Sequence, residues 1–388
     1  MHPTAAEIEK ELAELRRVGA YKSAPLLDGP MGPTVRLADR TEVVNLCSNN
    51  YLGLANHHEV VEAAKAAMDK FGYGTASVRF ICGSYEIHHQ LESLIADWLG
   101  MEAATTYVSC WNANEALVPT LLGEGDVVIS DELNHASIID ACRLCGRKVS
   151  RLIYKHSDMA DLVARLDEAA DAGRKLVFTD GVFSMEGDLA NLPEISALAS
   201  KHNALVAVDD SHAHGVLGPT GRGTPEHFGV SVDIVTGTLG KALGGAAGGF
   251  VAADRPIIDL LVQRSRPQIF SNSLPPAVAG GAIAAIELLR SSGELVEQLR
   301  KNVAFLRNGL AELGWEALDS PSAIVPIIVG DTTKAIRMAD QMLDCGVLIT
   351  GFGHPVVPEG TARLRAQVSA AHNKEHLDNA LQAFASLR

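Results

Sequence analysis

The sequence has little positive charge and no long run of apolar residues. Its 388 residues include 33 Lys plus Arg against 47 Asp plus Glu, a formal net charge of −14. This balance argues against a basic nucleic-acid binder and against a basic face for membrane lipids. No apolar stretch approaches the roughly 18 residues that a membrane-spanning helix needs, and the first residues lead into an acidic helix rather than a signal peptide. These features predict a cytoplasmic protein without nucleic-acid or membrane partners.

Cysteines are few and scattered, at positions 47, 82, 110, 142, 145 and 345. A disulfide framework is not expected in so long a chain without a secretion signal. Cys142 and Cys145 form one C-x-x-C pair, but a structural zinc site needs two further ligands at compatible spacing, and no second pair is present. The sequence therefore predicts neutral thiols and no metal site.

Several common enzyme motifs are also missing. No G-x-G-x-x-G follows a strand-like run, and neither H-E-x-x-H nor G-x-S-x-G occurs, which removes the simplest nicotinamide, zinc-hydrolase and α/β-hydrolase interpretations. The segment around Lys241 resembles a P-loop only superficially. Val235 stands where the first glycine belongs, and Ala242 replaces the Ser or Thr that holds magnesium.

What the sequence does have, between about residues 46 and 270, is an alternation of short apolar runs with helical stretches. The clearest runs are residues 127–130, 176–180, 204–209 and 234–237. This alternation is typical of a parallel, doubly wound sheet with helices on both faces. Ligands of such sheets gather outside the carboxyl ends of the strands. Each run ends in polar or small residues, so we expect the functional chemistry at those ends.

The chain divides into three predicted parts: an N-terminal helix and arm (1–45), a large domain (46–275) and a smaller C-terminal α/β domain (276–388). Thr4 and Glu7 form a capping-box pattern that predicts a helix from about 5 to 18. Residues 275–276 are both proline and open a Gly- and Ala-rich helix. The run 323–329, a helix near 333–345 and the segment 363–365 make up the small domain.

A lysine stands in a loop of small residues directly after the run 234–237. Lys241 is close to Gly240, Gly244 and Gly245, which permit close approach of the backbone to a ligand. A lysine that attacks a carbonyl carbon to form a Schiff base needs that approach and partial desolvation. Taken alone, a lysine at a strand end is more often a solvated surface residue.

A carboxylate ends another apolar run some thirty residues earlier. Asp209 suits the task of keeping a pyridine nitrogen protonated, because each unit of raised pKa represents about 1.4 kcal/mol of preference for the charged form. His212, three residues on, is placed to hydrogen-bond a ring substituent. The alternative is a metal-binding or general-base Asp/His pair, and without Lys241 the two interpretations have equal weight.

Two further segments complete a pattern. Residues 109–114 (SCWNAN) are a polar loop that opens a helix, whose free backbone N–H groups form an anion site. His135 offers a flat ring for stacking. Either segment alone is more often structural. A lysine for an aldehyde, an aspartate for a ring nitrogen, a ring to stack and a helix N-terminus for a phosphate together describe a pyridoxal phosphate (PLP) pocket.

In this arrangement the chain resembles the α-oxoamine synthases, a family of fold type I PLP enzymes, along nearly its whole length. The motifs that carry the resemblance are residues 49–54 (NNYLGL), 76–83 (ASVRFICG), 134–137 (NHAS), 180–185 (DGVFSM), 209–212 (DDSH), 238–241 (TLGK), 264–267 (RSRP), 270–273 (FSNS), 351–352 (GF) and 355–358 (PVVP). The resemblance implies an α/β fold with a large doubly wound, mixed or parallel sheet domain and a smaller C-terminal α/β domain.

The resemblance also implies roles for individual residues. Lys241 would bond the cofactor aldehyde, Asp209 pair with the pyridinium, His212 contact the phenolic oxygen and His135 stack on the ring; these four are the expected catalytic set. The other implied cofactor-binding residues are Ser109, Cys110, Trp111, Ser184 and Thr238, with Phe270 and Ser271 from the neighbouring subunit of a homodimer with shared active sites. The implied substrate-binding residues are Asn50, Ser184 and Arg365, with Arg363 as the competing arginine.

The implied reaction is the condensation of glycine with an acyl-coenzyme A, most simply acetyl-coenzyme A, to a 2-amino-3-oxo acid such as 2-amino-3-ketobutyrate, or the reverse cleavage in threonine breakdown. A decarboxylating relative, such as an 8-amino-7-oxononanoate synthase or an enzyme with another amino acid or acyl donor, is the alternative. A catalytically silent partner subunit is a third possibility, but it would be expected to lack the lysine that Lys241 provides.

Overall fold

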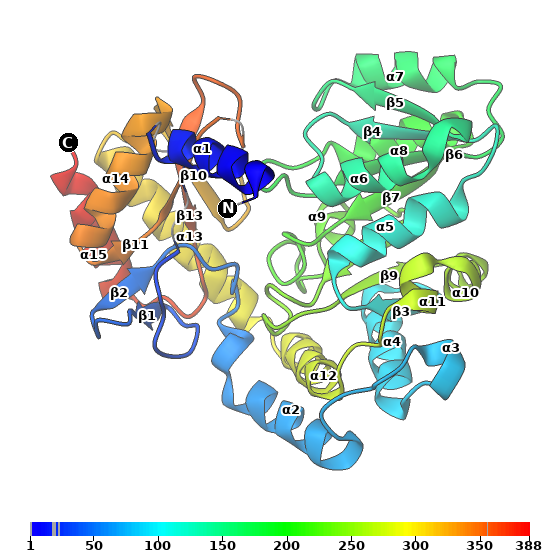
Figure 1. The fold of residues 1–388 in the computed structure, drawn as a ribbon, viewed down its shortest axis with the longest axis horizontal. Coiled ribbons are helices and arrows are strands. Elements are labelled where there is room, and N and C mark those ends of the chain that lie inside the picture. The colour runs from blue at the N-terminus through cyan, green and yellow to red at the C-terminus, as the bar shows by residue number, and fades with distance from the viewer. Residues whose placement is uncertain (1, 18–20, 22–23, 355) are drawn as a thin grey trace.

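The computed structural model of the chain describes all residues except 1, 18–20, 22–23 and 355. Its centre is a seven-stranded sheet in the order β3-β9-β8-β7-β6-β4-β5 (Figure 1). β9 runs antiparallel to both of its neighbours, and the other adjacent strands are parallel. The strands are β3 (Ala103–Tyr107), β4 (Val127–Asp131), β5 (Ser150–Tyr154), β6 (Lys175–Asp180), β7 (Leu205–Asp209), β8 (Ile234–Thr238) and β9 (Gly249–Ala253).

Helices cover both faces of this sheet because successive buried side chains of each strand point to opposite sides. Val128 and Phe178 pack in one cluster, while Val127 and Val177 pack in another. The first cluster is closed by α5 (Cys110–Leu121), α6 (Ala136–Leu144) and α10 (Arg255–Arg264), and the second by α7 (Met159–Glu168) and α8 (Leu192–Lys201). The prediction of a doubly wound sheet, either mixed or parallel, is confirmed, and the antiparallel β9 makes the sheet mixed.

The C-terminal part of the chain forms a second, antiparallel sheet in the order β10-β13-β12. Its strands are β10 (Ile324–Gly330), β12 (Thr350–Phe352) and β13 (Ala362–Gln367), and α14 (Thr332–Asp344) packs against all three. Nearby, α13 (Glu294–Glu312) packs against α15 (Lys374–Ser386). A third small sheet joins β1 (Thr34–Arg36) and β2 (Glu42–Asn45) to β11 (Val347–Leu348).

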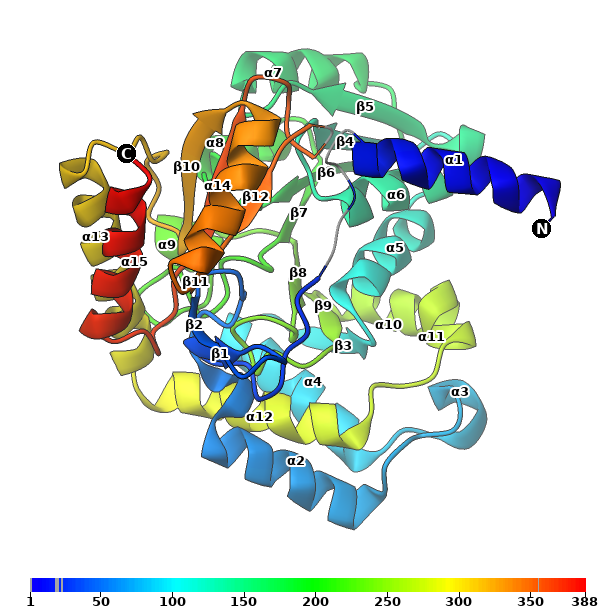
Figure 2. The same cartoon turned by 60° about the vertical axis from the view of Figure 1, so that its left-hand side comes forward.

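The remaining helices surround these sheets (Figure 2). They are α1 (Pro3–Arg17), α2 (His58–Phe71), α3 (Arg79–Cys82), α4 (Glu86–Leu99), α9 (Thr224–Phe228), α11 (Arg266–Phe270), α12 (Pro276–Ser291) and the short 3-10 turns Leu54–Asn56 and Gly146–Lys148. α12 lies alongside α2 and also contacts α4. The division of the chain at residues 45 and 275 stays a prediction, and elements on the two sides of each boundary are in contact, β2 with β11 and α2 with α12.

The predicted N-terminal helix exists, but its predicted cap is wrong. α1 begins at Pro3, so Thr4 lies inside the first turn, and its backbone N–H donates to His2 Nδ1 at 3.3 Å. Proline at the first helical position needs no hydrogen-bond partner, which lets the helix start one residue before the expected cap. The predicted end at residue 18 and Pro355 of the PVVP motif lie outside the described residues.

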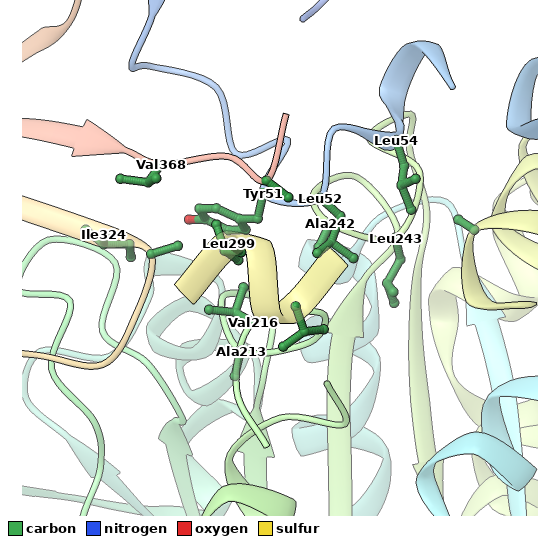
Figure 3. Close-up of a cluster of buried hydrophobic side chains, with 14 of the residues drawn as sticks. Tyr51, Leu52, Leu54, Ala213, Val216, Ala242, Leu243, Leu299, Ile324 and Val368 are labelled. Atoms are coloured by element: carbon green, nitrogen blue, oxygen red, sulfur yellow. The ribbon is translucent and has the colours of Figure 1, made fainter. Parts of the chain in front are cut away.

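A single apolar cluster joins the N-terminal segment, the large sheet and the C-terminal part (Figure 3). Tyr51 and Leu52 come from the N-terminal segment, Ala213 and Ala242 from loops of the large sheet, and Val368 from the chain that follows β13. Ala213 and Ala242 directly follow His212 and Lys241 in the sequence. The core therefore anchors the backbone next to two of the predicted site residues.

Candidate active site

The carboxyl ends of β6, β7 and β8 lie side by side and bring the chemistry-bearing residues to one edge of the sheet. In the sheet register Asp180 pairs with Asp209, and Asp209 pairs with Thr236. The loop that carries Lys241 begins directly after β8. Parallel pairing of β6 with β7 and of β7 with β8 places these strand ends together, as the sequence pattern predicted.

Asp209 is a buried carboxylate, 4% exposed, held by three donors. Its Oδ2 accepts from Asn114 Nδ2 at 2.7 Å and lies 3.7 Å from Cys110 Sγ. Its Oδ1 accepts from the backbone N–H of Ser211 at 2.9 Å. These contacts fix the carboxylate in one orientation, so it is preorganised to face a cationic partner.

A second buried carboxylate stands beside it. Asp180 accepts from the backbone N–H of His135 at 2.6 Å. Burial raises the pKa of Asp180 well above its usual range, and the negative charge of Asp209 raises it further. Two like charges at adjacent strand ends are unfavourable together, so a proton is held on Asp180 more readily than on an exposed carboxyl group.

Lys241 lies in this acidic pocket without an ion pair in the described part of the chain. Burial lowers the pKa of its ammonium, Arg365 lowers it further, and Asp209, Cys110 and Asp180 oppose that shift. A lowered pKa raises the fraction of neutral amine, which is the nucleophilic form. The site is therefore built for a lysine that reacts rather than for a solvated surface lysine.

His135 and Trp111 form the side of the pocket next to α6 and α5. His135 is the N-cap of α6, and its Nδ1 accepts from the backbone N–H of Ser137 at 3.2 Å. Burial lowers the pKa of His135. The indole of Trp111 meets the His135 ring edge-on, with centroids 5.9 Å apart. These contacts hold a neutral, flat imidazole in place.

The predicted anion site lies at the N-terminus of α5, which offers free backbone donors. Ser109 is its N-cap and accepts from the backbone N–H of Asn112 at 3.1 Å, while the N–H groups of Cys110 and Trp111 lie in the first turn, where a helix offers no internal acceptor. A Cβ at Gly249 would come within 2.2 Å of the Cys110 nitrogen, so only glycine allows this approach. Thr238 Oγ1 accepts from Gly240 N at 3.0 Å.

Two of the three predicted substrate residues, Arg365 and Ser184, are in direct contact. Arg365 Nη1 donates to the carbonyl of Ser184 at 2.7 Å, and its guanidinium lies 4.7 Å from the centre of the Phe352 ring. Asn50 is buried, and its Oδ1 accepts from the backbone N–H of Ala55 at 3.1 Å, while its amide nitrogen has no hydrogen-bond partner among the described residues.

The two arginines of β13 differ in their partners. Arg363 is 3% exposed and forms an ion pair with Glu186 at 3.0 Å. Arg365 has no carboxylate partner within the residues that the structure describes. A carboxylate that binds Arg363 would have to displace Glu186, whereas Arg365 has no carboxylate to displace. This difference favours Arg365 as the substrate residue.

Phe270 and Ser271 lie apart from this cluster. Phe270 is 71% exposed at the end of α11, with the Arg266 guanidinium 5.1 Å from its ring centre. Ser271 lines a separate small cavity together with Arg79 and Asn272. Within one chain these two residues do not join Lys241, and their predicted role depends on a second subunit.

Sequence reasoning gave no role to several residues that complete the site: Tyr51, Asn114, Asp180 and Gln367. Asn114 lies one helical turn after Cys110 on the same face of α5, a spacing that could have linked it to the pocket. Asp180 ends a predicted apolar run just as Asp209 does. Tyr51 and Gln367 are 316 positions apart, and no local signal connects them.

No group of three or more His, Cys, Asp or Glu side chains able to hold a metal ion occurs among the described residues. Likewise, none of the helices in the described segments has the length and apolar character needed to cross a membrane.

Comparison with known proteins extends these findings. The family model described as aminotransferase class I and II matches residues 41–384. The 2-amino-3-ketobutyrate coenzyme A ligase of Salmonella typhimurium is 47% identical over 382 residues, covering 97% of this chain and 96% of the relative. An 8-amino-7-oxononanoate synthase of Thermoanaerobacter pseudethanolicus is 46% identical over 380 residues, covering 97% and 95%.

Among solved structures, a lysine-to-alanine variant of serine palmitoyltransferase from S. paucimobilis with a bound PLP–myriocin aldimine superposes with a TM-score of 0.92 at 32% identity, covering 98% of this chain and 96% of that one. The fold is therefore that of the fold type I PLP-dependent transferases. The chain belongs to the aminotransferase class I and II family and, within it, to the α-oxoamine synthases, which confirms the resemblance seen in the sequence.

Proposed function

We propose that this protein is a PLP-dependent acyltransferase that condenses glycine with acetyl-coenzyme A to 2-amino-3-ketobutyrate, or cleaves that product with coenzyme A in threonine breakdown. The observation that carries the proposal is the 47% identity to a 2-amino-3-ketobutyrate coenzyme A ligase over 97% of the chain. A site with a reactive lysine beside a preorganised carboxylate is consistent with it. The presence of Lys241 argues against a catalytically silent subunit.

The residues of the site fit PLP by their chemistry. Lys241 would bond the aldehyde, and the Asp209 carboxylate would hold a proton on the ring nitrogen. The first turn of α5 offers N–H donors to a phosphate at a helix N-terminus, with Ser109, Cys110, Trp111 and Thr238 around it. His135 presents a flat neutral ring, and His212 faces the same pocket as Lys241.

PLP, when bound, supplies an electron sink for the negative charge that develops when the amino acid loses its Cα proton. The residues of the site would supply the remaining functions. Asp209 would keep the ring nitrogen protonated, the Lys241 amine would remove the Cα proton, and Arg365 would hold the substrate carboxylate through two parallel N–H groups. Ser184, whose carbonyl accepts from Arg365, and the Asn50 amide would assist in holding the substrate. Burial of the pocket strengthens each of these charge interactions.

Arg365 gives a prediction about the substrate carboxylate. We expect Arg365→Lys to raise the KM for glycine about 10- to 100-fold, because a bidentate charge-assisted contact worth about 1.5–3 kcal/mol is replaced by a point charge. The KM for acetyl-coenzyme A should stay nearly unchanged. Arg363→Lys is the matched control and should be mild, since Lys can keep the ion pair with Glu186. Steady-state kinetics decide, and a larger glycine defect at Arg363 would show that the wrong arginine was assigned.

The second candidate function is a decarboxylating synthase, such as one that acts on alanine. The 46% identity to an 8-amino-7-oxononanoate synthase supports this second candidate. The purified enzyme should be assayed with glycine, alanine and serine against short and long acyl-coenzyme A, with the product mass measured. Glycine with acetyl-coenzyme A should give the highest kcat/KM. Preference for alanine with a long acyl donor would replace the proposal by this alternative.

We further infer a homodimer with shared active sites and a cytoplasmic location. Support for the dimer comes from large apolar side chains that are exposed in one chain: Tyr73 is 88% exposed, Phe80 67%, Ile81 66% and Phe270 71%. Phe80 and Ile81 belong to α3, which contacts α11, the helix that ends in Phe270. Large exposed apolar side chains on two helices in contact favour an interface at this face. In a dimer, Phe270 and Ser271 would complete the partner's phosphate site.

Subunit complementation tests this arrangement. Lys241→Ala and Ser271→Asp proteins should each be inactive, the second because an added carboxylate repels the phosphate. After unfolding and refolding together in equal amounts, about a quarter of the wild-type activity should return, because half of the dimers are mixed and each holds one intact site. A fully active monomer in light scattering would contradict shared sites, as would no recovery in confirmed mixed dimers.

A further inference from the structure

A buried chain of hydrogen bonds connects Arg365 to His212, and the proposed chemistry above assigns it no role. Its two middle members are Gln367 and Tyr51, which are 1% and 0% exposed, and His212 at its end is 7% exposed. The three side chains come from distant parts of the sequence: the loop after β2, the end of β13 and the loop after β7. Tyr51 is fixed in the apolar cluster of Figure 3, so its hydroxyl has little freedom.

The arginine end sets the direction of these hydrogen bonds. Arg365 Nε lies 2.8 Å and Nη2 lies 3.2 Å from one end of the Gln367 amide. Guanidinium nitrogens only donate, so the amide oxygen must occupy that end. The amide nitrogen then faces Tyr51 Oη at 2.9 Å and donates to it.

Because of this arrangement, the Tyr51 hydroxyl donates its hydrogen bond to His212. The hydroxyl oxygen accepts from Gln367, so its single proton must go to another acceptor. His212 Nδ1 lies 2.8 Å from the hydroxyl, whereas Asn49 Oδ1 lies 3.3 Å away, beyond the usual range for an O–H donor. Burial raises the pKa of Tyr51, so the hydroxyl keeps its proton.

We propose that Tyr51, oriented by Gln367, is a positioning residue that fixes His212 in the neutral tautomer with a bare Nδ1 and a proton on Nε2. Burial lowers the pKa of His212 well below its usual value, and Lys241 and Arg365 lower it further, which agrees with a neutral ring. Nε2 has no hydrogen-bond partner among the described residues. It is therefore the donor that His212 offers to the pocket. That this donor meets the phenolic oxygen of PLP rests on the proposed function.

This chain of hydrogen bonds, from Arg365 through Gln367 and Tyr51 to His212, also connects the proposed substrate residue with the proposed cofactor residue. Arg365 is the residue proposed to hold the substrate carboxylate, and His212 is the residue proposed to contact the cofactor. The same Gln367 amide that orients the Arg365 fork orients the Tyr51 hydroxyl. Without the hydrogen bond from Tyr51, neutral His212 could adopt either tautomer, and only one of the two has a donor at Nε2.

A near-isosteric substitution should reverse the donor and acceptor roles between Tyr51 and His212. In Gln367→Glu, the carboxylate beside Arg365 stays ionised and can only accept, so the Tyr51 proton turns toward it. His212 must then donate from Nδ1 to the Tyr51 oxygen, which leaves Nε2 bare. Tyr51→Phe removes the acceptor and donor altogether and should leave a mixture of tautomers. Tyr154→Phe is the matched control, since Tyr154 is a fully buried tyrosine whose hydroxyl has no partner in the described structure.

The test is histidine-selective nitrogen-15 NMR on the holoenzyme, with the His212 signals assigned from their loss in His212→Asn. We expect a protonated Nε2 in the wild type and in Tyr154→Phe, a protonated Nδ1 in Gln367→Glu, and loss of the single Nε2-protonated form in Tyr51→Phe. In addition, kcat of Tyr51→Phe should fall about tenfold with little change in the glycine KM, as expected for a lost contact that does not bind substrate.

A protonated Nδ1 in the wild type would overturn the proposal, and so would an unchanged His212 tautomer in a folded Gln367→Glu protein. If Gln367→Glu does not fold, Tyr51→Phe decides in the same way: an unchanged single Nε2-protonated form would refute the role of Tyr51. Because the NMR result does not depend on turnover, failure of this inference is distinguishable from failure of the proposed glycine reaction.

Discussion

Replacing Lys241 by alanine is expected to abolish turnover, with a loss of at least about 1,000-fold in kcat, because one amine serves both as the covalent anchor and as the base. The fold should persist, since Lys241 forms no ion pair in the described part of the chain and removing a buried ammonium relieves a desolvation cost. The wild-type protein should be yellow and form an adduct with PLP that borohydride makes permanent. The variant should form no such adduct.

The control for this experiment is Lys334→Ala, an exposed lysine on α14 that should keep full activity and a normal adduct. Thermal unfolding of both variants checks that the fold is retained. A folded Lys241→Ala protein that still forms the reducible adduct at normal stoichiometry would overturn the assignment of the lysine.

Asp209→Asn carries the second large effect. A neutral amide no longer favours a charged ring nitrogen, and each lost pKa unit costs about tenfold in the stability of the charged form. A shift of two to three units would lower kcat by about 100- to 1,000-fold with a smaller change in KM, because the interaction strengthens as charge develops on Cα. Exchange of the glycine Cα proton with solvent, followed by NMR, should slow by a similar factor.

The neighbouring carboxylate provides a matched control. Asp210 is also fully buried, but its oxygens accept from the backbone N–H and the hydroxyl of Thr224. Burial raises the pKa of Asp210 to about 7, so the neutral amide in Asp210→Asn is a small electrostatic change. That variant should keep Cα proton exchange. Unchanged exchange in Asp209→Asn, or an equal loss in both variants, would count against the role of Asp209.

The sequence predicted four strands of the large domain, β4, β6, β7 and β8, because they are buried on both faces. It did not predict β3, β5 or β9, and most of β5 is exposed. A strand with both faces covered reads as a continuous apolar run, and residues 176–180 and 204–209 match β6 and β7 within one residue at either end. The antiparallel strand β9 would not have been assigned a direction even if found, since a buried strand has the same pattern in either direction. The capping box at Thr4 failed because a local cap motif competes with proline, which also starts helices.

The site was predictable where a residue follows a strand or opens a helix. Asp209, Lys241 and the Ser109 loop all hold such positions, and parallel strands bring those positions to one edge. The positions of Asn114 and Asp180 are visible in the sequence, but the hydrogen bond of Asn114 and the charge of Asp180 act on a neighbour, Asp209, and the sequence does not show these interactions. The contact of Tyr51 with Gln367 arises only when the N-terminal segment packs against the C-terminal sheet, so it required the structure.

The central claim is that glycine keeps its carboxylate during acyl transfer. It can be tested with glycine labelled with carbon-13 in the carboxylate and acetyl-coenzyme A. Because a 3-oxo acid loses carbon dioxide on standing, the reaction should be quenched rapidly with borohydride, which reduces the ketone to 2-amino-3-hydroxybutyrate. The account predicts that the earliest product retains the label in full. Release of labelled carbon dioxide at the rate of coenzyme A formation, with an unlabelled amino alcohol as the reduced product, would contradict it and assign the enzyme to the decarboxylating branch.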